Sequence, residues 1–174
     1  MPTFTTVYMD RGHSYAVRRD FDKAIGNFDK AIELMPSNAE VYYERGITYL
    51  EKGDLNEAIA DLDQAIKLNP DHVLAYINRG RVYLEKAEID LAVTDTSHAI
   101  ELLPNQILAY IYRGLAYKEK GDKSKAVADF TKVLEITNDP SQRQHAILQL
   151  KTLSLELTGC EFSTPQNARK LIRV

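Results

Sequence analysis

The sequence predicts an all-α fold, a solenoid of four stacked helix-turn-helix repeats followed by a C-terminal capping helix. Equivalent residues recur at a fixed interval of 34 positions, as from Gly12 to Gly46. Each interval contains two segments whose apolar residues have helical spacing, and a proline closes each of the first three intervals. Such self-similarity is typical of repeat arrays. The recurring residues are a glycine, two tyrosines and an alanine, namely Gly12, Gly46, Gly80 and Gly114; Tyr8, Tyr42, Tyr76 and Tyr110; Tyr15, Tyr49, Tyr83 and Tyr117; and Ala24, Ala58, Ala92 and Ala126.

The repeat of residues 39–72 shows the pattern most clearly, since both of its halves are amphipathic at helical spacing. Between the halves, Gly53 can adopt the left-handed conformation that ends a helix, and Asp54 can cap the next helix. Asp71 is positioned to cap the helix that follows. Gly46 lies in mid-helix, where glycine costs about 1 kcal/mol relative to alanine, so we expect it to mark a close approach of two helices.

The other three repeats differ mainly at the turn between their two helices, which we call the hinge. They span residues 5–38, 73–106 and 107–138. Arg19 and Ala87 occupy the hinge position of Gly53, whereas Gly121 restores the glycine. A left-handed Arg19 would cost roughly 1–2 kcal/mol, so a rearranged turn is an equal alternative in the first repeat.

Residues 140–158 predict a capping helix with an apolar inner face and a polar outer face. The last repeat of an array needs such a cover, because each repeat buries its apolar face only against neighbours. We therefore expect residues 1–159 to form one domain. The tail of residues 160–174 departs from the repeat, and Thr164 followed by Pro165 is an acceptable start for a short helix.

The period and the aromatic, Gly, Tyr, Ala and Pro positions resemble the tetratricopeptide repeat family. This resemblance implies a right-handed solenoid whose first helices line a concave groove that binds a peptide or a partner protein. Transfer of the family's groove positions to this chain selects Tyr43, Glu44, Ile47, Ile77, Asn78, Arg81, Ile111, Tyr112 and Leu115. An alternative for Ile77 and Ile111, as for Leu50 and Leu84, is that they pack neighbouring first helices together.

An arginine precedes the glycine of every repeat, where tetratricopeptide repeats commonly have leucine. These residues are Arg11, Arg45, Arg79 and Arg113, and Asn27, Asp61, Asp95 and Asp129 recur at one position of the second helix. We expect a ladder of Arg–Asp contacts between the two helices of each repeat. The alternative is that the arginine stems cover apolar surface while the guanidinium groups remain solvated.

The charges of the expected groove favour a basic and apolar partner. Repeats that clamp the C-terminal carboxylate of heat-shock chaperones use Lys, Asn and Arg at positions where this chain has Met9, His13, Glu44, Leu74 and Asn78. We therefore expect no binding of the chaperone type. The tail has both features of the favoured partner, in Arg169, Lys170, Leu171, Ile172 and Arg173. It is predicted to dock in the groove of its own or a neighbouring molecule, or else to form a short helix on the capping helix.

Composition and motifs argue against several other classes of function. The net charge of −3 and the acidic groove oppose binding of the phosphate backbone, so an RNA-binding helical repeat is a weaker alternative than a purely architectural scaffold. Four scattered histidines and one cysteine, Cys160, predict neither an enzyme, nor a metal site, nor a cofactor. The sequence contains no apolar run of membrane-spanning length, so we expect no membrane partner and a cytoplasmic location.

Overall fold

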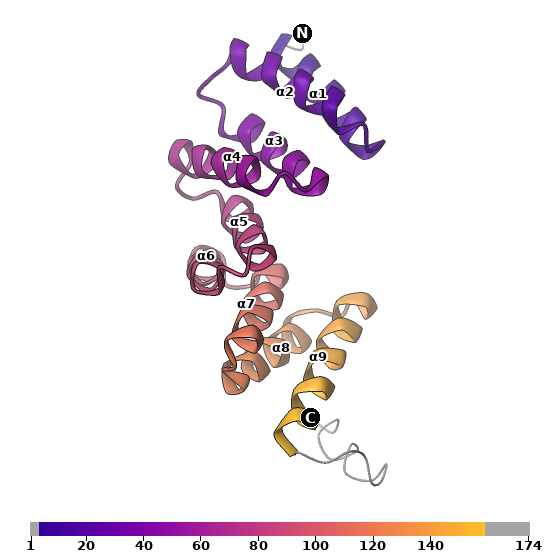
Figure 1. Cartoon of the computed structure of the whole chain (residues 1–174), viewed down its shortest axis with the longest axis vertical. Coiled ribbons are helices and arrows are strands. Elements are labelled where there is room, and N and C mark those ends of the chain that lie inside the picture. Colours follow the sequence, from indigo (N-terminus) through magenta and orange to yellow (C-terminus); the bar gives the residue numbers. More distant parts are fainter. Residues whose placement is uncertain (1–3, 159–174) are drawn as a thin grey trace.

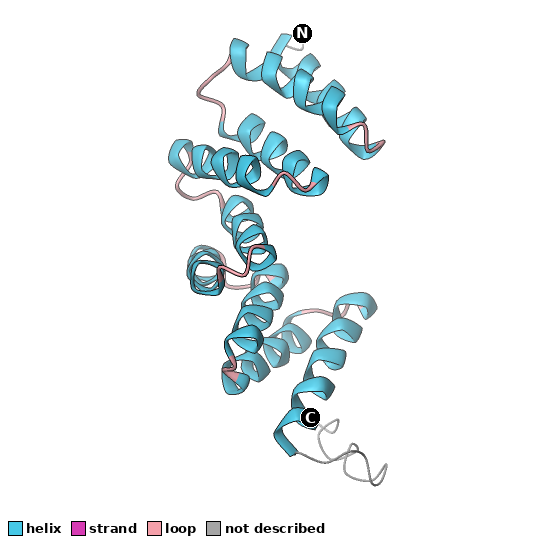
Figure 2. Ribbon diagram, in the orientation of Figure 1, coloured by secondary structure: helices cyan, strands magenta, loops and turns pink. Residues whose placement is uncertain are grey.

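The computed structural model describes residues 4–158, which fold as an all-α helical repeat solenoid (Figures 1 and 2). The helices of this part of the chain are α1 (Phe4–Val17), α2 (Phe21–Leu34), α3 (Ala39–Lys52), α4 (Leu55–Leu68), α5 (Val73–Glu85), α6 (Ile89–Leu102), α7 (Ile107–Lys120), α8 (Lys123–Ile136) and α9 (Pro140–Thr158). Helices α1 to α8 form four successive pairs that match the four repeats to within one residue, and α9 follows the last pair. None of the helices between residues 4 and 158 has both the length and the apolar character needed to span a bilayer.

The helices stack in chain order along the long axis of the molecule, from α1 at one end to α9 at the other (Figure 1). Each second helix (α2, α4, α6) packs against both helices that flank it in sequence, and α8 packs against α7 and α9. The first helices also touch one another directly, α1 with α3, α3 with α5 and α5 with α7. The first helices therefore form one continuous layer, and α9 covers the end of the array beyond α8.

The recurring small residues mark the contact between the two helices of each repeat, as expected. A Cβ atom on Gly80 would lie 2.8 Å from Thr96 Cγ2, and one on Gly46 would lie 3.2 Å from Asp61 Cβ. The recurring alanines of the second helices are fully buried, at Ala24, Ala58, Ala92 and Ala126. Close packing of the two helices therefore offsets the free-energy cost of a glycine in mid-helix.

All four hinges adopt the same left-handed conformation, whichever residue occupies them. The φ angles are 93° at Gly53 and 82° at Gly121, and they are 61° at Arg19 and 58° at Ala87. In each hinge the next backbone N–H closes the turn on the tyrosine carbonyl five residues earlier, as Asp54 N does on Tyr49 O at 2.9 Å. Arg19 therefore follows the standard turn, and the rearranged turn is not what the chain forms.

The helix caps differ from the sequence-based expectation at two aspartates. Asp54 occupies the N-cap of α4 but makes no side-chain cap hydrogen bond; its carboxylate lies 3.0 Å from Lys52 Nζ instead. Asp71 is not the cap of α5, because the helix begins at Val73 and its N-cap is His72, whose Nδ1 accepts from Ala75 N–H at 3.3 Å. The prediction of a cap at Asp71 was wrong by one residue.

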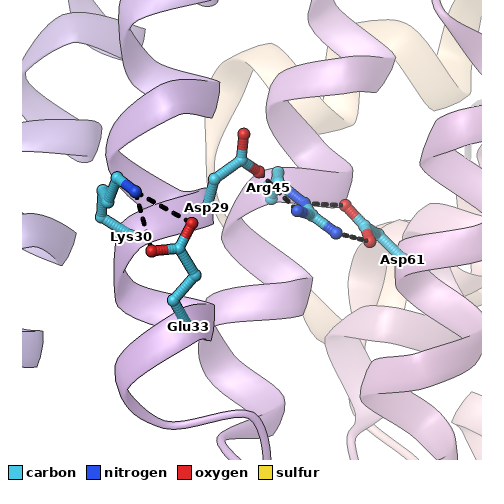
Figure 3. Close-up of polar contacts among 5 residues, drawn as sticks. All are labelled: Asp29, Lys30, Glu33, Arg45 and Asp61. Atoms are coloured by element: carbon cyan, nitrogen blue, oxygen red, sulfur yellow. Dashed lines mark hydrogen bonds and ion pairs between the residues drawn. The ribbon is translucent and has the colours of Figure 1, made fainter.

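The expected Arg–Asp ladder is present in the second, third and fourth repeats. Arg45 Nε and Nη2 each donate to the Asp61 carboxylate at 2.7 Å, and Arg79 contacts Asp95 in the same bidentate way (Figure 3 shows the Arg45 pair). Arg113 repeats the geometry with Asp129 at 2.9 and 2.8 Å. The paired aspartates are buried, so their charges require these partners.

Each ladder arginine also reaches back to the preceding repeat and is flanked by tyrosines. The remaining Nη1 of Arg45 contacts Asp29 on α2 (Figure 3), and its guanidinium carbon lies 5.8 and 6.0 Å from the ring centroids of Tyr42 and Tyr49. One side chain thus joins three helices, α2, α3 and α4. The first repeat lacks this arrangement, since Asn27 donates to Lys23 O at 2.7 Å instead of meeting Arg11.

Replacement of Arg79 by Leu is expected to destabilise the chain by roughly 3 kcal/mol, although leucine is the common residue of the family, because Asp95 would remain buried without its cation. Urea denaturation measures the change. Arg11→Leu is the matched control, at the equivalent position without a carboxylate, and should cost much less. The double variant Arg79→Leu, Asp95→Leu should recover part of the loss. Equal stability of Arg79→Leu and Arg11→Leu would show that the ladder contributes nothing.

Ala87→Gly is expected to stabilise the chain by roughly 1 kcal/mol, because the left-handed conformation of Ala87 costs alanine what glycine avoids. The melting temperature measured by circular dichroism should rise. Ala60→Gly, at an exposed position within α4, is the control and should lower it by a similar amount. A fall in melting temperature for both variants contradicts the argument.

Candidate partner-binding face

The side of the first helices that bears the groove positions selected from sequence forms a continuous surface, which we call the first-helix face. The positions recur at the 34-residue interval, so equivalent residues lie in rows across α1, α3, α5 and α7. Side chains meet from one helix to the next. Asn78 Nδ2 donates to Tyr43 Oη at 3.3 Å, and His13 Nδ1 lies 3.6 Å from Glu44 Oε2. The stacking thus brings together residues that lie one repeat apart.

The apolar members of the selected set are mostly packed between helices. Ile77 is 0% exposed and Ile111 is 7% exposed, and they belong to core clusters. Ile47 and Leu115 are partly buried against the same kind of cluster. Ile77 and Ile111 therefore have the packing role that the sequence left open. The polar and aromatic members, Tyr43, Glu44, Asn78, Arg81 and Tyr112, retain partial exposure.

Arg81 occupies the centre of the face and links three helices. Its Nη1 contacts Glu51 of α3 and its Nε contacts Glu85 of α5, both at 3.1 Å. Tyr112 of α7 lies close enough for the Arg81 charge to act on its hydroxyl. The sequence selected Arg81 and Tyr112 singly but did not show that Arg81 is already neutralised by two carboxylates.

His72 belongs to the same face and was missed in the sequence. Its ring lies 4.8 Å from the Tyr43 ring, centroid to centroid, and its Nε2 lies 3.4 Å from Glu40 Oε2. That nitrogen is buried and has no hydrogen-bond partner. One feature of the sequence could have indicated His72. It directly precedes α5, and a residue at the start of one first helix lies beside the start of the preceding first helix, here Glu40 of α3.

Burial changes the acid–base properties of the face. Desolvation raises the pKa of Tyr43 to about 12 and raises the pKa of Glu44, and it raises the pKa of Tyr112 as well. The two tyrosines therefore remain neutral hydrogen-bonding groups at physiological pH.

The capping helix borders the first-helix face at its C-terminal end. Lys118 Nζ of α7 donates to Gln149 Oε1 of α9 at 2.9 Å.

Within residues 4–158, no group of three or more His, Cys, Asp or Glu side chains is arranged to hold a metal ion. The chemistry of the described face is that of hydrogen bonding, aromatic contact and charge. Together with the recurring helix pairs, this face defines the class as a helical-repeat protein.

Comparison with known proteins gives the family. The family model described as TPR repeat matches residues 12–53 and 48–87, and that described as tetratricopeptide repeat matches residues 108–140. A crystal structure of MamA is 33% identical with a TM-score of 0.71, over 75% of this chain and 77% of that chain. The chain belongs to the tetratricopeptide repeat family, whose fold is a module for protein–protein interaction.

Two other solved structures are similar in fold. MamA 41-end from Desulfovibrio magneticus RS-1 is 23% identical with a TM-score of 0.75, over 91% of this chain and 94% of that chain. The first TPR of Spaghetti (RPAP3), bound to the HSP90 peptide SRMEEVD, is 26% identical with a TM-score of 0.66, over 70% of this chain and 94% of that chain. None of the curated proteins compared matches the chain.

The stability of the chain is expected to fall between pH 10 and pH 12 partly through Tyr43. Its pKa rises from 10.0 to about 12 on folding, so the folded state favours the neutral phenol, and this contribution is lost as the pH rises toward the folded pKa. The full shift would correspond to about 2 kcal/mol at pH 11.5, and water around this partly exposed ring reduces the effect by about half. The stability difference between the wild type and Tyr43→Phe should therefore shrink by about 1 kcal/mol from pH 8 to pH 11.5 and stay constant from pH 6 to pH 8. Urea denaturation of both proteins at pH 6, 8 and 11.5 measures this difference in stability. A difference that stays constant over all three pH values contradicts the burial argument.

Proposed function

We propose that the first-helix face is a binding groove for a cationic and apolar segment of a partner protein. The observation that supports this best is the charge of the face. Its carboxylates come from all of α3, α5 and α7, at Glu40, Glu44, Glu51, Glu85 and Glu119. Arg81 pairs with two of these carboxylates, Glu51 and Glu85, and Lys118 donates to Gln149, so the five glutamates still outnumber the two cations. An approaching cation therefore meets an excess of negative charge.

Tyr43 and Tyr112 supply the aromatic contacts of the proposed groove. Each is partly exposed and has a polar neighbour in an adjacent repeat: Asn78 of the following repeat for Tyr43, and Arg81 of the preceding repeat for Tyr112. Aromatic residues are common binding anchors, because they present a large area and lose little conformational entropy on binding. Tyr43 lies on α3 and Tyr112 on α7, with α5 between them. This arrangement suits an extended segment that crosses the three helices.

The tail of residues 160–174 is a candidate occupant of this groove. It lies outside the described residues, so its docking rests on complementarity of charge. Arg169, Lys170 and Arg173 would meet the glutamates, and Leu171 and Ile172 would contact the aromatic rings. A neighbouring molecule is as suitable a host as the same chain, because the glutamates are densest on α3 and α9 lies at the opposite end of the stack.

The same charges oppose a chaperone-type ligand. The related RPAP3 repeat is bound to SRMEEVD, a peptide that ends in acidic residues and a free carboxylate. At the corresponding place this chain has Glu44, whose pKa is raised by burial, and His13 beside it. A second carboxylate would add a like charge to a partly desolvated site, which costs free energy.

A labelled peptide of residues 160–174 should bind the full chain with micromolar affinity, as measured by fluorescence anisotropy. The receptor has Arg169, Lys170 and Arg173 changed to Glu, so that its own tail does not compete. Glu44→Lys should weaken binding about tenfold, equivalent to about 1.4 kcal/mol, because it replaces attraction by repulsion.

The matched control is Glu57→Lys, which makes the same charge change on the second helix α4 and should leave the affinity unchanged. SRMEEVD should not bind measurably. Tighter binding of SRMEEVD than of the tail peptide, or equal effects of the two lysine variants, contradicts the proposal.

A further inference from the structure

The outer face of α1 is the one first-helix surface in residues 4–158 that no preceding helix covers. In the interior of the array, α2 covers α3, α4 covers α5 and α6 covers α7. The covered position is fully buried in each case, at Val41, Ala75 and Ala109. The equivalent residue of α1 is Val7, which is 41% exposed, and Phe4 one turn earlier is 81% exposed. The stacking surface of α1 is thus built like the others but open within the described part of the chain.

The polar part of this surface is open as well. Arg45 and Arg79 each contact a carboxylate of the preceding helix, Asp29 and Asp63 respectively, at 2.5 Å. Arg11 occupies the same position on α1 and is exposed. Among the described residues it has no carboxylate partner; its one interaction is with the Tyr8 ring, 6.0 Å from the guanidinium carbon.

The array itself shows what kind of helix fits such a face. The covering helices present an apolar residue, then an acceptor four positions later, then an apolar residue three positions after that. These sets are Ile25, Asp29 and Ile32 on α2; Ile59, Asp63 and Ile66 on α4; and Val93, Ser97 and Ile100 on α6. The apolar members pack on the next repeat, as Ile59 and Ile66 do in the cluster that contains Ala75 and Val82.

We propose that the outer face of α1 binds an amphipathic helix of a partner protein that carries this pattern, with its carboxylate on Arg11 and its apolar residues on Phe4 and Val7. A second copy of the chain is not the proposed occupant, because its own helices of this kind are already engaged: α2, α4 and α6 cover the next repeat and α8 is covered by α9. This surface is at the end of the stack and separate from the groove of the first-helix face.

The probe is a peptide of residues 55–68, the sequence of α4, with a hydrocarbon staple between positions 56 and 60. The staple is needed because a free helix of this length is marginal in water, and these positions are exposed and outside the binding pattern. The labelled peptide should bind the full chain in an anisotropy titration. Arg11→Ala should weaken binding at least about tenfold. The control Arg18→Ala, an exposed arginine just beyond α1, should not change it.

A charge exchange makes the test independent of effects on folding. The chain with Arg11→Asp should lose the wild-type peptide but bind the peptide with Asp63→Arg, and the wild-type chain should reject that peptide. Equal binding to the Arg11→Ala and Arg18→Ala chains, or no binding at 100-fold peptide excess, overturns the proposal. So does sedimentation of the chain alone as a dimer that Val7→Asp dissociates, since a second copy would then be the occupant.

Discussion

The bidentate pairing of a first-helix arginine with a second-helix aspartate is the interaction on which the rest of the array depends. Asp61, Asp95 and Asp129 are buried, and an unpaired buried carboxylate is too costly for a marginally stable chain. The register of the two helices is therefore fixed, since a slip of one residue would separate both charges. The same guanidinium reaches the preceding repeat, so the pair that orders one helical hairpin also orients its neighbour (Figure 3). The rings of Tyr42 and Tyr49 flank this guanidinium, at 5.8 and 6.0 Å from centroid to guanidinium carbon.

Much of the fold could be predicted because the same residues recur at the same positions in four repeats. The 34-residue interval located every helix pair, and recurrence of Arg and Asp at fixed positions predicted the ladder. The hinge at Arg19 could not be settled, because its local cost opposes left-handed backbone while the flanking helices require it. The second carboxylate, Asp29, was not foreseen either. It lies in a different repeat from Arg45, and only the stacking geometry brings them together.

The candidate site was predicted less completely than the fold, for a physical reason. Positions on one helix face include residues that meet solvent and residues that meet the next helix, and the spacing along the chain does not separate the two. Ile77 and Ile111 share a row with Tyr43, yet they are buried members of core clusters, whereas Tyr43 is partly exposed. His72 was missed because it is the N-cap residue of α5, and the groove positions were sought only within the helices.

The junctions between repeats are not chemically equal, and this gives the solenoid a graded response to its medium. Arg45 and Arg79 bind partly exposed carboxylates across the first two junctions, at Asp29 and Asp63, whereas Arg113 meets the neutral hydroxyl of Ser97 at 3.2 Å across the third. Dissolved ions screen exposed charge pairs and leave a neutral hydrogen bond and apolar contacts largely unaffected. Ionic strength therefore weakens the Arg45–Asp29 and Arg79–Asp63 contacts of the first two junctions more than the Arg113–Ser97 contact of the third.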